Sequence, residues 1–130
     1  MISITKLWCD DNFDYNKLRY GIGSSQKDGS SRKPIVVWNT TRTCNLNCIH
    51  CYSKSTSQYY EGELSTDEGK QLIDDLAEFK VPSILFSGGE PLIRKDIFEL
   101  IEYATSKGLR AVLSTNGTLI NQKVAGRLKR

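Results

Sequence analysis

The stretch that decides the fold runs from Ser83 to Leu113 and reads SILFSGGEPLIRKDIFELIEYATSKGLRAVL. Its first five residues, 83–87, are a short apolar run that predicts a buried strand. Asp96 can begin a helix in which apolar residues recur at positions 97, 100, 101 and 104, and Lys107-Gly108 can end it. Residues 109–113 indicate a further strand. The order strand, helix, strand predicts two parallel strands joined by a helix.

The same alternation continues in both directions along the chain. Upstream, residues 35–38 (IVVW) predict a first strand, and Ser65 with Glu68 forms a capping-box signature before a helix that must end by Pro82. Downstream, Asn121 can cap a third helix. We therefore expect an α/β fold with a parallel sheet built from three βα units. The pattern leaves two architectures open, a doubly wound sheet and part of a (β/α) barrel.

Composition excludes several classes of protein. The chain has 130 residues, 38% hydrophobic and 25% charged, which is typical of an ordinary soluble domain rather than a disordered one. No apolar run approaches the roughly 20 residues that a membrane span needs. A net charge of +3 is too small to indicate a nucleic-acid partner. We expect neither a membrane nor a nucleic acid among its partners.

The first 33 residues differ from the rest. They show no clean period and end in GIGSSQKDGSSRK (21–33), so we expect an N-terminal extension with a flexible loop, and a domain over residues 34–130. The start of the chain also lacks the apolar core of a secretory signal. Four cysteines without such a signal favour a reducing compartment, the cytoplasm. Cys9 is expected to be a buried or spare thiol.

An unusual polar or glycine-rich cluster follows each predicted strand. The clusters are CNLNCIHC (44–51), GGEPL (88–92) and STNG (114–117). In parallel α/β folds, function gathers at the carboxyl ends of the strands. We therefore expect the three clusters to converge on one edge of the sheet.

Cys44, Cys48 and Cys51 have the spacing C-x3-C-x2-C within one loop. Three thiolates favour a soft metal centre, either zinc or an iron–sulfur cluster. Structural zinc sites close with a fourth ligand, commonly from a second C-x2-C pair, and no such pair is present. A [4Fe–4S] cluster on three cysteines leaves one iron open for another ligand. The spacing favours the cluster and keeps zinc as the alternative.

The other two clusters carry weaker signals. Gly88 and Gly89 would let the backbone approach a ligand closely, and Glu90 could bind a cationic group such as an ammonium, although Gly-Gly is also common in plain turns. Ser114 and its two neighbours offer hydroxyl and amide groups to a ligand. Taken alone, that segment is better explained as a turn.

The three clusters together resemble the motifs of the radical SAM superfamily, over a region from Pro34 to the end of the chain. The cysteine motif carries His50 at an aromatic position, and Gly88-Gly89-Glu90 is similar to the family's GGE motif. The resemblance implies a [4Fe–4S] cluster on three cysteines (Cys44, Cys48 and Cys51) and S-adenosylmethionine (SAM) on the fourth iron. The SAM contacts that it implies are His50, Gly88, Gly89, Glu90, Ser114, Thr115 and Asn116.

The activity implied by the resemblance is reductive cleavage of SAM to a 5′-deoxyadenosyl radical, with reduced ferredoxin or flavodoxin as the electron donor. The family core has six βα units in a partial barrel, so this chain would supply its N-terminal half. Residues 4–9 (ITKLWC), 18–21 (LRYG) and 36–42 (VVWNTTR) are similar to the haem-biosynthesis branch. That likeness implies side-chain removal from an iron tetrapyrrole, a small-molecule substrate.

Three other interpretations are kept in view. Within the family, the chain could belong to a peptide-modifying enzyme of the SPASM type. In another class, it could be a non-catalytic zinc-binding interaction module. A nucleotide-binding Rossmann domain is disfavoured, because G-x-G-x-x-G should follow the first strand and residues 39–44 contain no glycine.

Overall fold

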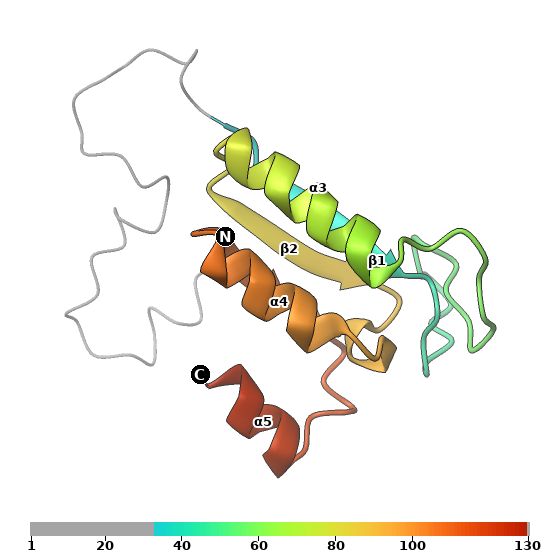
Figure 1. The fold of residues 1–130 in the computed structure, drawn as a ribbon. Helices are drawn as coiled ribbons and strands as arrows, with labels where there is room; N and C mark the ends of the chain where they lie inside the picture. Colours follow the sequence, from blue (N-terminus) through green and yellow to red (C-terminus); the bar gives the residue numbers. More distant parts are fainter. Residues whose placement is uncertain (1–32, 130) are drawn as a thin grey trace, which may run out of the picture. The chain divides into compact units, whose positions relative to one another are not determined.

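The computed structural model describes residues 33–129, so the predictions made for residues 1–32, Cys9 included, lie outside the described part. The elements follow in the order β1 (Val36–Thr41), α3 (Thr66–Glu78), β2 (Ser83–Gly88), the short 3₁₀ helix η2 (Pro91–Ile93), α4 (Ile97–Ser106), β3 (Arg110–Leu113) and α5 (Gln122–Leu128) (Figure 1). The predicted alternation of strands and helices is confirmed. No helix within residues 33–129 is long and apolar enough to cross a membrane.

The three strands form one parallel sheet in the order β1-β2-β3. Val37 pairs with Leu85, and Leu85 pairs with Val112, so all three strands run in register toward the same edge. The register shifts between Asn39 and Thr41, where β1 approaches its end. The parallel α/β fold is thus confirmed, and the carboxyl ends of the strands meet at one edge as expected.

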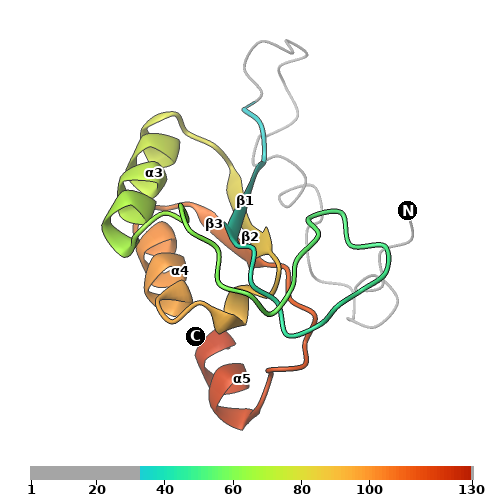
Figure 2. The same ribbon diagram turned by 90° about the vertical axis from the view of Figure 1, so that its right-hand side faces the viewer.

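Helices α3 and α4 lie on the same face of the sheet (Figure 2). Alternate strand residues face these helices and pack with them in the core. Its buried members are Ile73, Val81, Ile84, Phe86, Ile97, Leu100, Ala104 and Leu109. On the opposite face, Val37 and Val112 are 55% and 37% exposed. A doubly wound sheet carries helices on both faces, whereas a barrel carries them outside only. The shared face therefore favours the barrel arrangement.

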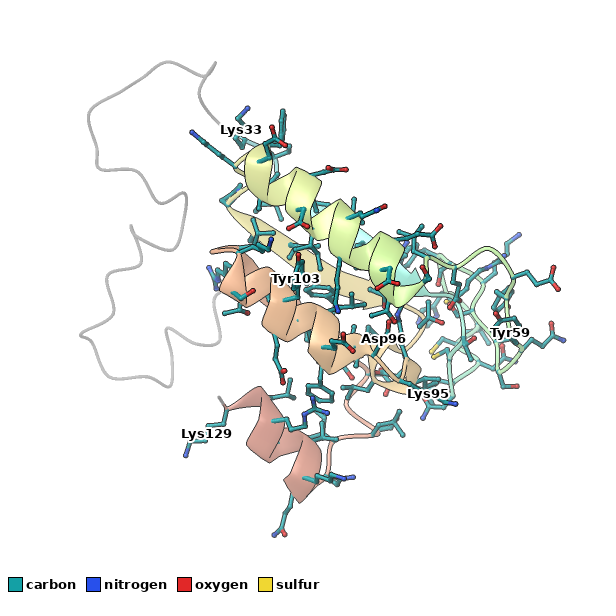
Figure 3. The ribbon with its side chains drawn as sticks, viewed as in Figure 1. Lys33, Tyr59, Lys95, Asp96, Tyr103 and Lys129 are labelled. Atoms are coloured by element: carbon teal, nitrogen blue, oxygen red, sulfur yellow. The ribbon has the colours of Figure 1, made fainter. Side chains whose placement is uncertain are left out.

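The helix starts confirm two of the predicted caps and show a different role at a third. Ser65 and Glu68 form both bonds of the capping box, and the Asn121 side chain accepts from the Val124 N–H. Asp96 stands at the N-cap of α4 but makes no capping bond with its side chain. Its carboxylate instead accepts from Arg94 and from the Thr66 hydroxyl of α3, and Figure 3 shows it between the two helices.

Candidate functional site

The double-glycine turn after β2 packs directly against the end of β1. Gly88 has φ +129°, and a Cβ atom there would lie 2.2 Å from the Thr41 carbonyl oxygen. A Cβ atom on Gly89 would lie 2.3 Å from the Thr43 carbonyl oxygen. The Gly89 N–H also donates to Thr41 O at 2.7 Å. Both glycines are therefore required by backbone-to-backbone contact, before any ligand is considered.

The buried carboxylate of Glu90 links the turn after β2 to the loop after β3. Its side chain is completely buried. One carboxylate oxygen accepts from the Leu92 N–H at 3.0 Å and the Thr115 hydroxyl at 2.8 Å. The other accepts from the Asn116 N–H at 2.7 Å. Three donors compensate for the desolvation of this charge, and they fix two of the predicted clusters relative to each other.

The third predicted cluster is the cysteine loop, which we define as residues 44–51. Its start is fixed by a bridge between Thr43 and Thr56 and by the Cys44 N–H, which donates to Thr56 O at 2.8 Å. The Cys44 side chain is buried, with its sulfur 3.4 Å from the Leu46 nitrogen. Cys48 and His50 are exposed. The loop is thus anchored at its first cysteine and open to solvent beyond it.

Cys51, at the end of the loop, has a thiol poised for ionisation. The hydroxyl of Ser53 lies 3.3 Å from its sulfur, and that hydroxyl contacts the Ser55 hydroxyl at 2.7 Å. The hydrogen bond with Ser53, followed by one with the Ser55 backbone, lowers the pKa of the Cys51 thiol to about 7. Near neutral pH this side chain is substantially thiolate, the form that binds metals.

The structure brings the three clusters to one edge but does not gather the three thiols around one point. Within the described residues, no group of three or more His, Cys, Asp or Glu side chains is close enough to hold a metal ion. The cysteines are free thiols rather than disulfides. Their chemistry still suits a cluster, because three sulfur ligands lie within eight residues.

The loop after β3 contacts the cysteine loop through Asn116. Its side-chain nitrogen donates to the Asn45 oxygen at 3.0 Å and lies 3.9 Å from the Cys44 sulfur. The side-chain nitrogen of Asn45 in turn donates to the Thr118 hydroxyl at 2.8 Å. Sequence reasoning missed Asn45 and Thr118, since nothing in the pattern distinguishes them from ordinary loop residues. Ser114 is exposed, and its N–H donates to Phe86 O at 2.9 Å.

A cavity of about 530 Å³ opens beside this edge, on the β1 side. Its walls come from β1 and from residues 52–53 and 60–64. Among the described residues, Gly88 is the one predicted site residue that lines it. The neighbouring Tyr59 projects away from the sheet (Figure 3). Glu63, also in the wall, accepts from the Thr41 hydroxyl and the Arg42 N–H. The cavity therefore adjoins the site without containing the thiols.

Comparison with known proteins places this arrangement in a family. The chain is 53% identical to the Fe-coproporphyrin III synthase of Methanosarcina barkeri, over 99% of this chain and 34% of the relative. It is 50% identical to the AdoMet-dependent heme synthase of Nitratidesulfovibrio vulgaris, over 79% of this chain and 28% of the relative. The chain thus spans about a third of the length of these curated relatives.

A solved structure supports the same assignment at the level of the fold. BtrN, solved in complex with AdoMet and 2-DOIA, superimposes with a TM-score of 0.63 at 23% identity, over 73% of this chain and 40% of BtrN. The sequence profile described as "Radical SAM superfamily" matches residues 38–130, which include the end of β1 and all three clusters. This chain belongs to the radical SAM superfamily.

Proposed function

We propose that this chain carries the cluster-binding and SAM-binding part of a radical SAM enzyme that acts on an iron tetrapyrrole. The observation that carries the proposal is the meeting, at one sheet edge, of the cysteine loop with the turn after β2 and the loop after β3. The family assignment adds the expectation that this edge binds SAM. Iron–sulfur enzymes of this kind belong in a reducing compartment, which favours the cytoplasm.

In this proposal Cys44, Cys48 and Cys51 hold a [4Fe–4S] cluster. Three thiolate ligands satisfy three irons and leave one iron for SAM. The exposed position of Cys48 leaves room for the loop to close around a cluster. The chemistry that the cluster would supply is the one-electron reductive cleavage of bound SAM to a 5′-deoxyadenosyl radical, with reduced ferredoxin or flavodoxin as electron donor. The protein's own task is to position the reactants and exclude water.

The remaining predicted residues would hold SAM. Gly88 is the last residue of β2, and Gly89 follows it. The groups of Ser114, Thr115 and Asn116 and the His50 ring belong to loops that follow β3 and β1. The carboxylate of Glu90 is buried and already accepts three hydrogen bonds. We therefore propose that Glu90 supports the SAM site indirectly, by fixing the loop after β3.

The substrate part of the proposal depends on the names of the relatives. One is a Fe-coproporphyrin III synthase and another an AdoMet-dependent heme synthase, both at 50% identity or more. These names support chemistry on an iron tetrapyrrole, and we propose removal of its side chains as the reaction. A peptide substrate of the SPASM type remains the alternative to be tested.

The experiment is anaerobic reconstitution of the chain with ferrous iron and sulfide. We expect a brown protein with about four irons and four sulfides per chain, and loss of both in Cys48→Ala. Asn47→Ala, in the same loop, is the matched control and should load normally. Addition of SAM and dithionite should release 5′-deoxyadenosine. One zinc per chain with no colour would replace the proposal with a zinc-binding module.

A further inference from the structure

The hydrogen bonds at the edge form a continuous path from the core to the first cysteine. The path begins at the buried carboxylate of Glu90, which accepts from the Thr115 hydroxyl and the Asn116 N–H. A completely buried carboxylate has few other positions available, so the backbone that it binds is held in place. The backbone of Asn116 is therefore fixed from beneath by the core of the domain.

The side chain of Asn116 continues the path in a closed ring with two other residues. Its nitrogen donates to the Asn45 oxygen at 3.0 Å, and the Asn45 nitrogen donates to the Thr118 hydroxyl at 2.8 Å. The Thr118 hydroxyl donates back to the Asn116 oxygen at 2.7 Å. Each amide uses both its oxygen and its nitrogen. A flip of Asn45 would break two bonds, and a flip of Asn116 would break three, because the Thr118 N–H also donates to the Asn116 oxygen at 2.9 Å. The ring thus fixes the orientation of both amides.

The ring lies against the sulfur of Cys44. The Asn116 nitrogen is 3.9 Å from that sulfur, and Asn45 is the residue that directly follows Cys44. Cys44 is 8% exposed, in contrast to the exposed Cys48. The first cysteine is thus the one that the loop after β3 holds.

We propose that Asn116 is a positioning residue for Cys44, which it holds through the ring with Asn45 and Thr118. Its role at a cluster rests on the proposed function, whereas the hydrogen bonds that fix Cys44 are present in the metal-free chain. Loss of the ring frees the start of the cysteine loop, exposes the Cys44 thiol and removes one pre-formed ligand position.

The first test measures alkylation by iodoacetamide in the metal-free chain, with each cysteine resolved by mass spectrometry. The ratio of the Cys44 rate to the Cys48 rate, taken at one pH for every variant, cancels differences in reagent concentration. A net hydrogen-bond contribution predicts that this ratio rises about three- to tenfold in Asn116→Ala and in Thr118→Val. Thr118→Ser restores the hydroxyl and should restore the parental ratio. Asn47→Ala is the control outside the ring and should leave the ratio unchanged.

The second test uses the reconstituted chain and follows iron release to a chelator by absorbance. Iron should leave faster from Thr118→Val than from the parent, and Thr118→Ser should retain it as the parent does. If the ring served only the stability of the fold, Thr118→Val would lower the urea midpoint and still release iron at the parental rate.

The outcomes separate this inference from the proposed function. A Cys44 to Cys48 ratio that stays parental in both Asn116→Ala and Thr118→Val overturns the inference, whatever the chain binds. Parental iron release from loaded Thr118→Val overturns it as well and leaves the proposed function standing. A parent chain that takes up no iron overturns the proposed function, and the alkylation ratio still decides the role of Asn116.

Discussion

Replacement of Gly89 by alanine tests whether the double glycine serves the fold or only a ligand. The added Cβ atom would lie 2.3 Å from the Thr43 carbonyl oxygen and 2.8 Å from that of Arg42. Both neighbours are backbone atoms, so no side chain can rotate away. The φ angle of Gly89 lies outside the left-handed region, so the cost is steric rather than conformational.

The magnitude follows from what must move. To relieve the contact, the turn must separate from the end of β1, which weakens the bonds from Gly89 N–H to Thr41 O (2.7 Å) and from Glu90 N–H to Thr43 O (3.0 Å). Two such bonds contribute about 1 kcal/mol each, and overpacking adds about 1–3 kcal/mol. We expect Gly89→Ala to lower the free energy of unfolding by about 3–5 kcal/mol.

The assay is urea-induced unfolding followed by tryptophan fluorescence, since Trp38 packs against Phe86 in the core with ring centroids 5.8 Å apart. Gly126→Ala is the matched control. Gly126 lies within α5, where a Cβ meets nothing within 4 Å and no residue is buried, so alanine should leave the urea midpoint within error. If Gly89→Ala unfolds at the parental urea concentration but fails to bind SAM, the steric reasoning is refuted and ligand approach explains the glycine.

Three further changes test other parts of the fold. Ser65→Ala removes the capping bond at the start of α3 and should cost about 1 kcal/mol in urea unfolding. Burial alone would raise the pKa of Asp96, but hydrogen bonds from Arg94 and Thr66 outweigh it and hold that pKa below its ordinary value. The stabilisation is therefore present at neutral pH and lost as the pH falls below about 4. Asp96→Asn should be about 2 kcal/mol less stable at pH 7 and lose less on acidification, and a parental pH profile would contradict this. Asn121→Ala should speed amide exchange in α5 while leaving the urea midpoint within error, because none of the α5 residues is buried.

The regular elements could be predicted because their signals are local. The capping box at Ser65 and the glycine stop at Gly108 (φ +81°) involve neighbours in sequence, and the strands are apolar runs bounded by such signals. The convergence of the three clusters followed from the parallel order of the strands, since that order alone places their carboxyl ends at one edge.

The environments of the site residues could not be predicted, because their partners come from elsewhere in the chain. Asp96 was expected only to begin a helix, yet its carboxylate binds Thr66, thirty positions away. Glu90 was expected to offer its charge to a ligand, and its donors include residues 115 and 116 on another loop. The buried Cys44 likewise lies beside residue 116, a contact that no spacing rule contains.

These contacts change how loss of activity at the motif residues should be interpreted. Gly88, Gly89 and Glu90 match a family motif associated with SAM, and each also has a structural role that exists without SAM. A variant at any of them that loses activity is therefore ambiguous, because a displaced turn removes the ligand site indirectly. The side chain of Asn116 is exposed and its bonds join two loops rather than core elements, so its replacement should disturb the fold less than replacement of Gly88, Gly89 or Glu90. The stability and the Cys44 reactivity of each variant must therefore be measured together. Only then can a loss of activity at the GGE residues or at Asn116 be assigned to a lost contact with SAM.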